Sequence, residues 1–415
     1  MKYRILAKTI IKALKSFPVV VVTGPRQSGK TTLLKNIFKD THAYVNLEDP
    51  DTRIRAKEDP RGFLEQHKPP VIFDEIQYIP ELLPYIKTKI DENRKPGQWI
   101  LTGSQNFVLT HNVSESLAGR AAILSLLPFS FSERFGLGES AVDTNSLLKI
   151  LPARRQINLR NDSQSDKKIS LATLLLRGNY PEIASKSSID RQLWCGSYII
   201  TYIERDIRNL SHVGDMNQFE RFLRLCATMT GQILNVSELA RDIGVSVPTA
   251  KRWISLLETG YQIYLLYPYY KNLGKRLIKS PKIYFNDTAL ACYLMGLNDP
   301  NSLLNSSHFP HIFETFIVID FWKRFLNFGE MPSLYYLRTL DGLEIDLVIE
   351  IKQKLHLFEI KSVATIIPKH ASSLLRAKRD IGNIVRSSDI ISLSPKSFYL
   401  PKGINNYTWQ DILSL

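Results

Sequence analysis

The stretch Pro18-Val-Val-Val-Val-Thr-Gly24-Pro-Arg-Gln-Ser-Gly29-Lys30-Thr31-Thr32 decides how the first part of this chain folds. The apolar run from Pro18 to Gly24 is typical of a buried β-strand, and a helix is predicted from about Thr31 to Lys39. Between them, Gly24, Gly29, Lys30 and Thr31 match every fixed position of the phosphate-binding loop pattern G-x-x-x-x-G-K-[ST]. The two glycines let the backbone bend so that its N–H groups point at phosphate oxygens. The stretch therefore predicts a nucleotide-binding α/β domain.

The loop assigns a role to several residues. We expect Lys30 to reach the β- and γ-phosphates of ATP and Thr31 to ligate Mg²⁺. The N-terminus of the following helix adds a favourable dipole for the anion. The predicted ATP-binding residues are Gly24, Pro25, Arg26, Gln27, Ser28, Gly29, Lys30, Thr31 and Thr32.

Further strands are predicted at Ala43–Leu47, Pro69–Gln77, Gly97–Gln105 and Ala121–Leu127, with helices between them. Alternating strands and helices indicate a parallel sheet with helices on both faces. The N-terminal sequence MKYRILAKTIIKALKSF spaces its apolar residues as an amphipathic helix does, and lysines interrupt it too often for a signal peptide. Residues 1–135 are therefore assigned to one P-loop ATPase domain.

Four polar residues are candidates for the chemistry of this domain. In VIFDEIQ, Val71 to Gln77, an apolar strand ends in two acids, and active groups of parallel strands gather at this end. Asp74 is expected to hold Mg²⁺ through water, and Glu75 to act as general base toward the attacking water. Ser104 either senses the γ-phosphate or only caps a strand. Arg120 is either an arginine finger or a surface arginine; a finger from a neighbouring copy would require oligomerisation, and the sequence sets no oligomeric state.

The remaining chain divides by composition into four parts. Residues 136–170 are polar and lack periodicity, which indicates a linker or an exposed insertion. Residues 171–230 read as a helical, lid-like segment. Residues 231–300 read as helix, turn at Gly244, helix and strand, the order of a winged helix-turn-helix. Residues 301–415 begin with an apolar helix and continue with alternating strands, which predicts a second α/β domain.

Basic residues in the helix-turn-helix suggest DNA contacts. Lys251 and Arg252 lie on the predicted recognition helix, and Lys271, Lys275 and Arg276 follow the next strand as a basic wing. Such side chains would contact phosphates with salt-dependent affinity. The alternative is that the module packs against the nucleotide domain and never touches DNA.

The segments Leu343–Glu350 and Leu355–Lys361 can pair as a hairpin. If the turn centres between residues 352 and 353, Asp346 faces Glu359. Two opposed carboxylates repel each other unless a cation lies between them, and a divalent metal would serve. The alternative is a solvent-facing hairpin in which Glu344 and Lys361 form an ordinary ion pair, and a slip of one residue would separate the two acids.

Composition sets the outer limits. The chain has 415 residues, enough for two or three domains, and its 54 Lys and Arg against 40 Asp and Glu give a net charge of +14. This excess favours a polyanionic partner such as nucleic acid. The three distant cysteines exclude a disulfide scaffold, argue against a cysteine-based zinc site, and fit a reducing, cytoplasmic location. No apolar run is long enough to span a bilayer, so no membrane partner is expected.

A series of motifs resembles a known family. GPRQSGKTTLL, VIFDEIQ, LTGSQNF, LPFSFSE, LRGNYPEI, YIERDI, SPKIYFNDTALACYLMG and IFETFIV occur in this order. Together they resemble the AAA+-type ATPases, related to the STAND switch proteins, that carry an AAA domain followed by a DUF4143 domain. The resemblance implies ATP binding, slow hydrolysis, and a C-terminal part with a winged helix and a restriction-endonuclease-like fold. The polar stretch 141–170 is longer than the typical connection.

The hairpin also resembles the core of PD-(D/E)xK nucleases. In that scheme Asp346 and Glu359 bind Mg²⁺, Lys361 orients the attacking water, and Glu314 on the preceding helix is the additional acid. The whole chain then reads as an ATPase whose nucleotide state controls a winged helix and a nuclease-like domain on DNA. Two alternative functions remain. The chain could be a regulatory switch without nuclease activity, or an ATPase that works through a protein partner.

Overall fold

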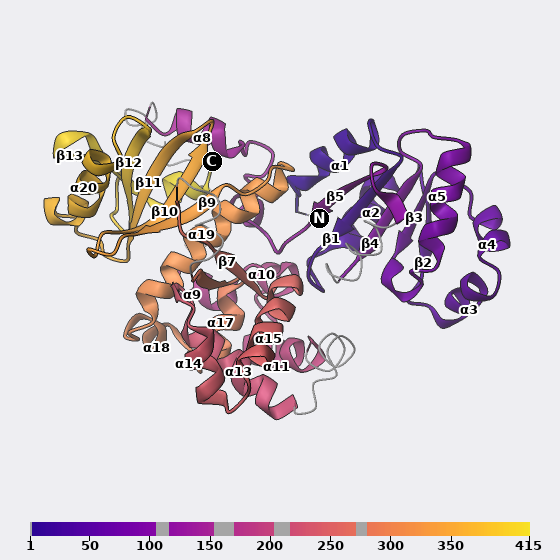
Figure 1. Ribbon diagram of the computed structural model, residues 1–415, viewed down its shortest axis with the longest axis horizontal. Helices are drawn as coiled ribbons and strands as arrows, with labels where there is room; N and C mark the ends of the chain where they lie inside the picture. The colour runs from indigo at the N-terminus through magenta and orange to yellow at the C-terminus, as the bar shows by residue number, and fades with distance from the viewer. Residues whose placement is uncertain (1, 105–115, 153–169, 203–215, 271–279) are drawn as a thin grey trace.

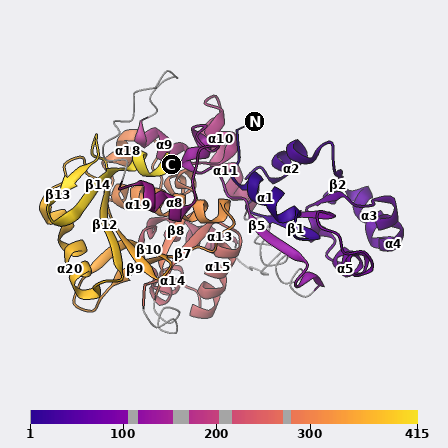
Figure 2. The same ribbon diagram turned by 90° about the horizontal axis from the view of Figure 1, so that it is seen from above.

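The computed structural model describes residues 2–104, 116–152, 170–202, 216–270 and 280–415. Figure 1 shows a separate N-terminal α/β domain, a helical middle part and a C-terminal sheet. The perpendicular view shows the N-terminal domain at one end and the C-terminal sheet at the other (Figure 2). None of the described helices combines the length and the apolar character needed to cross a membrane. Cys195, Cys226 and Cys292 are buried free thiols.

The N-terminal domain contains a five-stranded parallel sheet with the order β2-β3-β4-β1-β5. Alternate side chains along each strand enter two separate cores, because successive residues point to opposite faces. Val20, Val22 and Ile100 pack with one set of helices, and Val19 and Val21 pack with the other. The predicted parallel sheet with helices on both faces is confirmed. The strands are β1 (Val19–Thr23), β2 (Ala43–Asn46), β3 (Val71–Asp74), β4 (Trp99–Gly103) and β5 (Ala121–Ser125).

Helices cover the two faces of this sheet. The predicted amphipathic N-terminal helix is present as α1 (Leu6–Leu14), which buries Leu6 and Ile10 on the same face as α2 (Lys30–Phe38). The other face is covered by α4 (Pro60–Gln66) and α5 (Leu82–Glu92). Ahead of α4 lies α3 (Pro50–Glu58), and α7 (Phe131–Arg134) follows the sheet.

The middle part is mainly helical. The expected helix-turn-helix is formed by α14 (Val236–Ile243) and α15 (Val247–Thr259). Gly244 ends α14 with a φ of 77°, a conformation that favours glycine, and Ser246 caps α15. A small antiparallel sheet with the order β6-β8-β7 lies beside them. Its strands and the other helices are β6 (Gln232–Ile233), β7 (Ile263–Leu266), β8 (Lys282–Phe285), α9 (Leu171–Arg177), α10 (Pro181–Ser185), α11 (Arg191–Tyr202), α13 (Met216–Thr228), α17 (Thr288–Leu294) and α18 (Pro300–Leu304).

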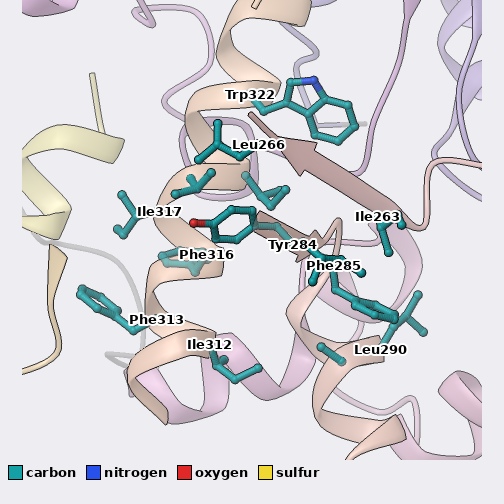
Figure 3. Close-up of a cluster of buried hydrophobic side chains, with 14 of the residues drawn as sticks. Ile263, Leu266, Tyr284, Phe285, Leu290, Ile312, Phe313, Phe316, Ile317 and Trp322 are labelled. Carbon is teal, nitrogen blue, oxygen red and sulfur yellow. The ribbon is translucent and has the colours of Figure 1, made fainter. Parts of the chain in front are cut away.

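The C-terminal part is built on α19 (Phe309–Asn327), a helix that is buried along nearly its whole length. Its apolar residues pack on β7, β8 and α17, as the side chains of Figure 3 show. Next to it lies a six-stranded mixed sheet with the order β13-β14-β12-β11-β10-β9. The elements are β9 (Leu334–Arg338), β10 (Glu344–Ile351), β11 (Lys354–Lys361), α20 (Ser372–Ile381), β12 (Val385–Ser392), β13 (Phe398–Leu400), β14 (Ile404–Thr408) and α21 (Trp409–Leu413).

The segment expected to be a linker contains a helix. Within 136–170, α8 (Thr144–Ile150) is capped by Asp143 and buries Leu147 and Leu148. The backbone N–H of Val142 donates to the carbonyl of Leu415 at 2.8 Å, so this segment is tied to the C-terminal domain. Residues 144–150 are therefore a helix packed in the fold, within the segment for which the sequence indicated a linker or an exposed insertion. One buried pair of leucines is too short a signal to show helical periodicity.

Candidate functional site

The backbone of the phosphate-binding loop depends on two glycines with positive φ. Gly24 has a φ of 142°, and a Cβ there would lie 2.1 Å from the carbonyl oxygen of Leu126. Gly29 has a φ of 94° and begins α2. Both conformations are costly for residues with a side chain, which explains the glycine positions of the motif.

Lys30 is buried at 5% exposure, and its ammonium donates to the carbonyl oxygens of Gly24 and Pro25 at 2.9 and 3.0 Å. The lysine is thus held over its own loop. Phosphate oxygens entering the loop would compete with these carbonyls for the ammonium, and they carry a full negative charge. The arrangement suits a group that turns toward an incoming phosphate.

Asp74 collects hydroxyl groups at the end of β3. Thr31 and Tyr44 donate to Oδ2 at 2.7 and 2.5 Å, and Thr102 donates to Oδ1. Thr31 and Asp74 are therefore adjacent oxygen donors beside Lys30. This donor set fits Mg²⁺, which prefers carboxylate and hydroxyl oxygens next to phosphates. Tyr44 was missed from the sequence, because nothing in its strand distinguishes it from an ordinary aromatic residue.

Glu75 adopts a left-handed conformation, with a φ of 60° and a ψ of 49°, at the point where β3 ends. Its N–H donates to the hydroxyl of Thr102 at 3.0 Å, which holds the unusual backbone in place. The amide of Gln77 donates to the Glu75 carboxylate and to the Ser104 hydroxyl, the latter at 3.2 Å. The structure thus brings Glu75 and Ser104 together through Gln77, which the sequence reasoning did not single out.

A cavity of about 360 Å³ adjoins the loop. Two of its lining residues, Tyr198 and Thr201, come from α11 of the middle part. The Tyr198 hydroxyl lies 2.7 Å from that of Tyr180 and accepts from the Gln262 amide at 3.3 Å. Sequence reasoning missed both residues, because no motif marks them. The residues on the loop side of the cavity are Arg26, Gln27, Gly29, Lys30, Thr31, Thr32 and Glu75.

A third residue of the middle part contacts the strand end that precedes the loop. Tyr261 lies between α15 and β7 with its side chain buried, and its hydroxyl is 2.7 Å from Thr23 Oγ1 and 3.0 Å from Ser125 Oγ. Thr23 immediately precedes Gly24. The helix-turn-helix is therefore hydrogen-bonded to the strand ends that carry the loop.

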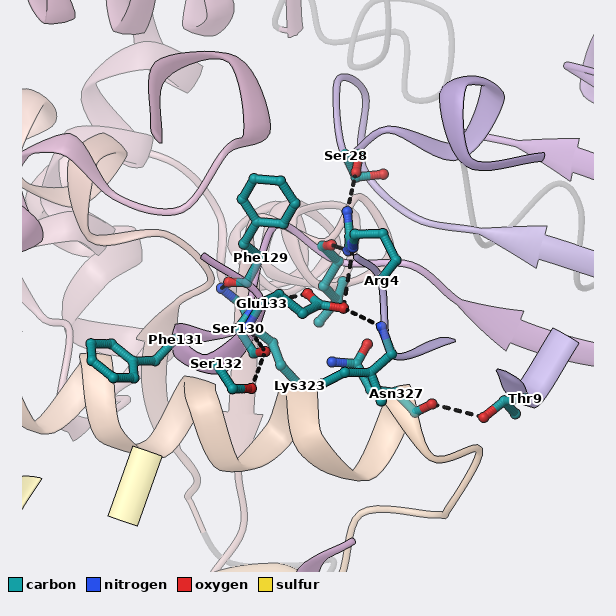
Figure 4. A network of polar contacts seen from close by, with 12 residues as sticks. Arg4, Thr9, Ser28, Phe129, Ser130, Phe131, Ser132, Glu133, Lys323 and Asn327 are labelled. Atoms are coloured by element: carbon teal, nitrogen blue, oxygen red, sulfur yellow. Dashed lines mark hydrogen bonds and ion pairs between the residues drawn. The ribbon is translucent and has the colours of Figure 1, made fainter. Parts of the chain in front are cut away.

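A buried arginine braces the loop from behind. Arg4 donates to the carbonyl oxygens of Ser28 and Leu127 at 2.8 and 2.5 Å, and it pairs with Glu133 at 3.2 Å (Figure 4). Glu133 belongs to the LPFSFSE motif, whose Phe129 carbonyl accepts from Lys323 of α19 at 3.1 Å. The network links the loop, the N-terminus and the C-terminal domain.

Arg120 does not reach its own nucleotide site. It lies just before β5, and its guanidinium pairs with Asp91 through contacts of 2.7 and 3.0 Å. The phosphate loop follows the opposite end of the neighbouring strand β1, because the two strands are parallel with Val19 beside Ala121. An arginine-finger role within the same chain is therefore excluded.

The C-terminal hairpin has the expected register. Leu347 pairs with Phe358 and Ile351 with Lys354, so the turn lies at residues 352 and 353. The Lys361 ammonium contacts Glu359 at 2.6 Å and Asp346 at 3.7 Å. The N–H of Ile360 donates to Asp346 at 2.8 Å. The predicted grouping of Asp346, Glu359 and Lys361 is confirmed as geometry.

The cluster contains a cation that the sequence analysis did not identify. Lys282 of β8 is buried, and its ammonium lies 3.2 Å from Glu314, 2.9 Å from Glu344 and 3.9 Å from Asp346. The alternative ion pair between Glu344 and Lys361 is therefore replaced by Glu344–Lys282. Within the described ranges, no three His, Cys, Asp or Glu side chains converge closely enough to hold a metal ion.

Burial shapes the acidity of this cluster. Burial first, and the neighbouring Asp346 charge second, raise the pKa of Glu359 to about 8. Burial raises the pKa of Glu314 to about 7, against the opposing effect of Lys282. A carboxyl group crowded by other carboxylates holds its proton more tightly.

The predicted DNA contacts are only partly described. Lys251 and Arg252 are exposed on α15, while the adjacent Trp253 is buried. The other basic candidates, Lys271, Lys275 and Arg276, lie outside the described residues.

Three family models match consecutive parts of the chain. An AAA domain matches residues 16–135, a domain of unknown function named DUF8612 matches 168–301, and the domain of unknown function DUF4143 matches 309–411. An uncharacterized protein of Mycobacterium tuberculosis is 30% identical over 377 residues, which cover 90% of this chain and 77% of the relative. The chain belongs to the family of AAA-domain ATPases with a C-terminal DUF4143 domain.

Other members and similar structures are more distant. An uncharacterized protein of Methanocaldococcus jannaschii is 23% identical over 371 residues, covering 84% of this chain and 76% of the relative. A Walker-type ATPase of Pyrococcus abyssi has a TM-score of 0.42 at 17% identity, covering 70% of this chain and 94% of that one. A RuvB variant of Thermotoga maritima has a TM-score of 0.29 at 16% identity, covering 62% and 88%. The AAA domain makes this family member a P-loop ATPase.

Proposed function

We propose that this ATPase is a Mg²⁺-dependent switch whose nucleotide state controls the helix-turn-helix and the C-terminal domain, and that it acts on DNA. The observation that carries the proposal is the composition of the nucleotide cavity. Tyr198 and Thr201 of the middle part line it together with the phosphate loop. A nucleotide bound there would touch both parts, so its presence would favour one arrangement of the two over others.

The chain's own residues take these roles in the proposed reaction. Lys30 turns from the Gly24 and Pro25 carbonyls to the phosphates, and Thr31 and Asp74 hold Mg²⁺, which neutralises phosphate charge when bound. Glu75 orients and deprotonates the attacking water. The Gln77 amide fixes the Glu75 carboxylate and ties it to Ser104, which makes Ser104 a positioning residue.

The Tyr261 hydroxyl offers a route from this site to the helix-turn-helix. Tyr261 follows α15 and is hydrogen-bonded to Thr23, the residue before the loop. A change in the loop that moves Thr23 would therefore also change the position of Tyr261 and of α15 before it. Coupling of this kind needs direct contact between two elements with alternative arrangements, and the bond supplies the contact.

DNA is the proposed partner because of charge. The chain has a net charge of +14 at pH 7, and Lys251 and Arg252 are exposed on α15. Cations on such a helix neutralise phosphates and release counterions, so the affinity should fall steeply with salt. If α15 meets a protein partner instead, this salt dependence is absent.

The test measures ATP hydrolysis by the full chain with and without duplex DNA, at low and moderate salt. We expect DNA to stimulate hydrolysis at low salt and Lys30→Ala to abolish ATP binding at the phosphate loop. Lys39→Ala, an exposed lysine just after α2, is the matched control and should behave as wild type. Hydrolysis that is indifferent to DNA, together with no DNA binding in a gel shift, would contradict the DNA role and favour the protein-partner reading.

A metal-dependent nuclease is the second candidate function, because the hairpin brings Asp346, Glu359 and Lys361 together. Here Asp346 and Glu359 would hold Mg²⁺, with Glu314 nearby as the third acid. The test is cleavage of duplex, single-stranded and branched DNA with Mg²⁺ or Mn²⁺. Cleavage should be lost in Asp346→Ala and kept in Glu350→Ala, a control from the other end of the same strand. Absence of cutting in the wild type would contradict this candidate.

A further inference from the structure

The largest cavity described in the C-terminal domain lies away from the acidic cluster. It has a volume of about 570 Å³ and lies between α8, the turn of the β10–β11 hairpin, and the near ends of β12 and β14. Figures 1 and 2 both place α8 beside this domain. His356, the lining residue of β11 nearest to Glu359, is three residues away, roughly 10 Å along the strand, and its side chain lies on the opposite face of the sheet. The cavity and the acidic cluster are therefore separate.

The rim of this cavity is strongly basic. Its cations come from four different elements and from the hairpin turn, and they are Lys149, Lys352, Lys354, Lys378 and Arg386. All are exposed. In the part of the chain that the structure describes, no ion pair joins any of them to a carboxylate. Like charges held close together repel one another, and an anion between them would remove that cost.

The floor of the cavity is polar and buried. Its side chains come from β11, β12 and β14, on the face of the sheet that α8 covers. Ser387 is 2.9 Å from His356 Nδ1, and Asn405 donates to the carboxylate of Asp389. Burial lowers the pKa of His356 to about 4, so the ring is neutral at pH 7. The floor therefore offers a hydroxyl, a neutral imidazole, an amide and a carboxylate as hydrogen-bond partners for a ligand.

The rim and floor together define a ligand class. A volume of about 570 Å³ falls in the range of small-molecule sites. Cations at the mouth suit phosphate groups, and the Ser387 hydroxyl, the His356 ring and the Asp389 carboxylate at the floor suit hydroxyl or ring N–H groups. We infer that this cleft binds a small phosphorylated ligand of nucleotide size, with its phosphates at Lys378, Arg386 and the lysines of the hairpin turn and its uncharged polar part against Ser387 and Asn405.

The experiment uses the full chain carrying Lys30→Ala, so that the phosphate loop does not contribute. Binding of ATP and of inorganic tripolyphosphate is measured by calorimetry at low and moderate salt. The double variant Lys378→Ala/Arg386→Ala should weaken both probes by about tenfold or more. Lys369→Ala/Lys396→Ala removes two exposed lysines of the same domain that do not line the cavity, and should leave binding unchanged.

A further variant tests the floor without changing charge. Ser387→Val should weaken ATP several-fold and leave tripolyphosphate nearly unchanged, because only ATP carries an uncharged part. If Lys378→Ala/Arg386→Ala and Lys369→Ala/Lys396→Ala lose the same amount of affinity, the inference is overturned, because the probes are then attracted to the basic surface as a whole. Absence of binding by Lys30→Ala would also overturn it. If a short DNA duplex binds here and neither small probe does, the site belongs to nucleic acid instead. None of these readouts depends on ATP hydrolysis, so they are independent of the proposed switch.

Discussion

The hydroxyl of Tyr261 lies 2.7 Å from Oγ1 of Thr23, the residue that precedes the first glycine of the phosphate loop. This bond crosses from the turn after helix α15 to the strand that carries the nucleotide site. Both side chains are buried, so the contact is shielded from water. Buried hydrogen bonds of this kind fix the relative positions of the elements they join.

Tyr261→Phe should weaken this link while keeping the ring. We expect the free energy of unfolding to fall by about 1 kcal/mol, and the effect of DNA on ATP hydrolysis to shrink, because the hydroxyl is the direct contact. Urea unfolding and ATPase assays with and without DNA measure the two effects. Tyr85→Phe, a half-buried tyrosine of α5, is the control. Full DNA stimulation in Tyr261→Phe would show that the signal takes another route.

Glu75→Gln should permit ATP binding and block turnover. The amide cannot accept a proton from water, while its shape and its contact with Gln77 are largely kept. A loss of about 10²-fold or more in kcat with a nearly unchanged ATP dissociation constant is expected. Gln77→Ala should have a smaller effect on kcat, because it only frees the carboxylate. Wild-type turnover by Glu75→Gln would remove Glu75 from the role of base.

Arg4 and Arg120 form a natural comparison between a buried and an exposed ion pair. Arg4→Ala leaves the buried Glu133 without its partner and should cost about 3–5 kcal/mol in unfolding free energy. Arg120→Ala breaks a partly exposed pair with Asp91 and should cost less than about 1 kcal/mol. Chemical unfolding of both variants gives the comparison. Equal costs would mean that Arg4 does not brace the loop.

The acidic cluster should make stability depend on pH. Because the pKa of Glu359 is raised to about 8 in the fold, the folded chain binds this proton more tightly than the unfolded chain does. Its contribution is therefore most favourable at acidic pH and is lost as the pH rises from about 4.5 through 8. Between pH 6 and pH 8, wild type should lose on the order of 1–2 kcal/mol relative to Glu359→Gln. Parallel unfolding curves of the two proteins across this range would contradict the raised pKa.

The sequence predicted those features that depend on local spacing. The phosphate loop, the parallel sheet, the helix-turn-helix and the register that places Asp346 near Glu359 all follow from short patterns. The contributions of Tyr198, Tyr261 and Lys282 depend on how distant segments pack, and no local pattern marks such residues. Arg120 shows the converse, because its place just before a strand of the predicted parallel sheet already puts it at the edge opposite the phosphate loop, and that consequence was not drawn.

The position of Lys282 determines how an isolated C-terminal domain would behave. The lysine belongs to the segment before α19, yet it balances Glu314, Glu344 and Asp346 of the C-terminal domain. A fragment that starts at residue 301 would lack this ammonium and would expose uncompensated carboxylates. Such a fragment would attract divalent ions more strongly than the intact chain does. Metal binding or cleavage by the excised domain would then be a property created by the cut.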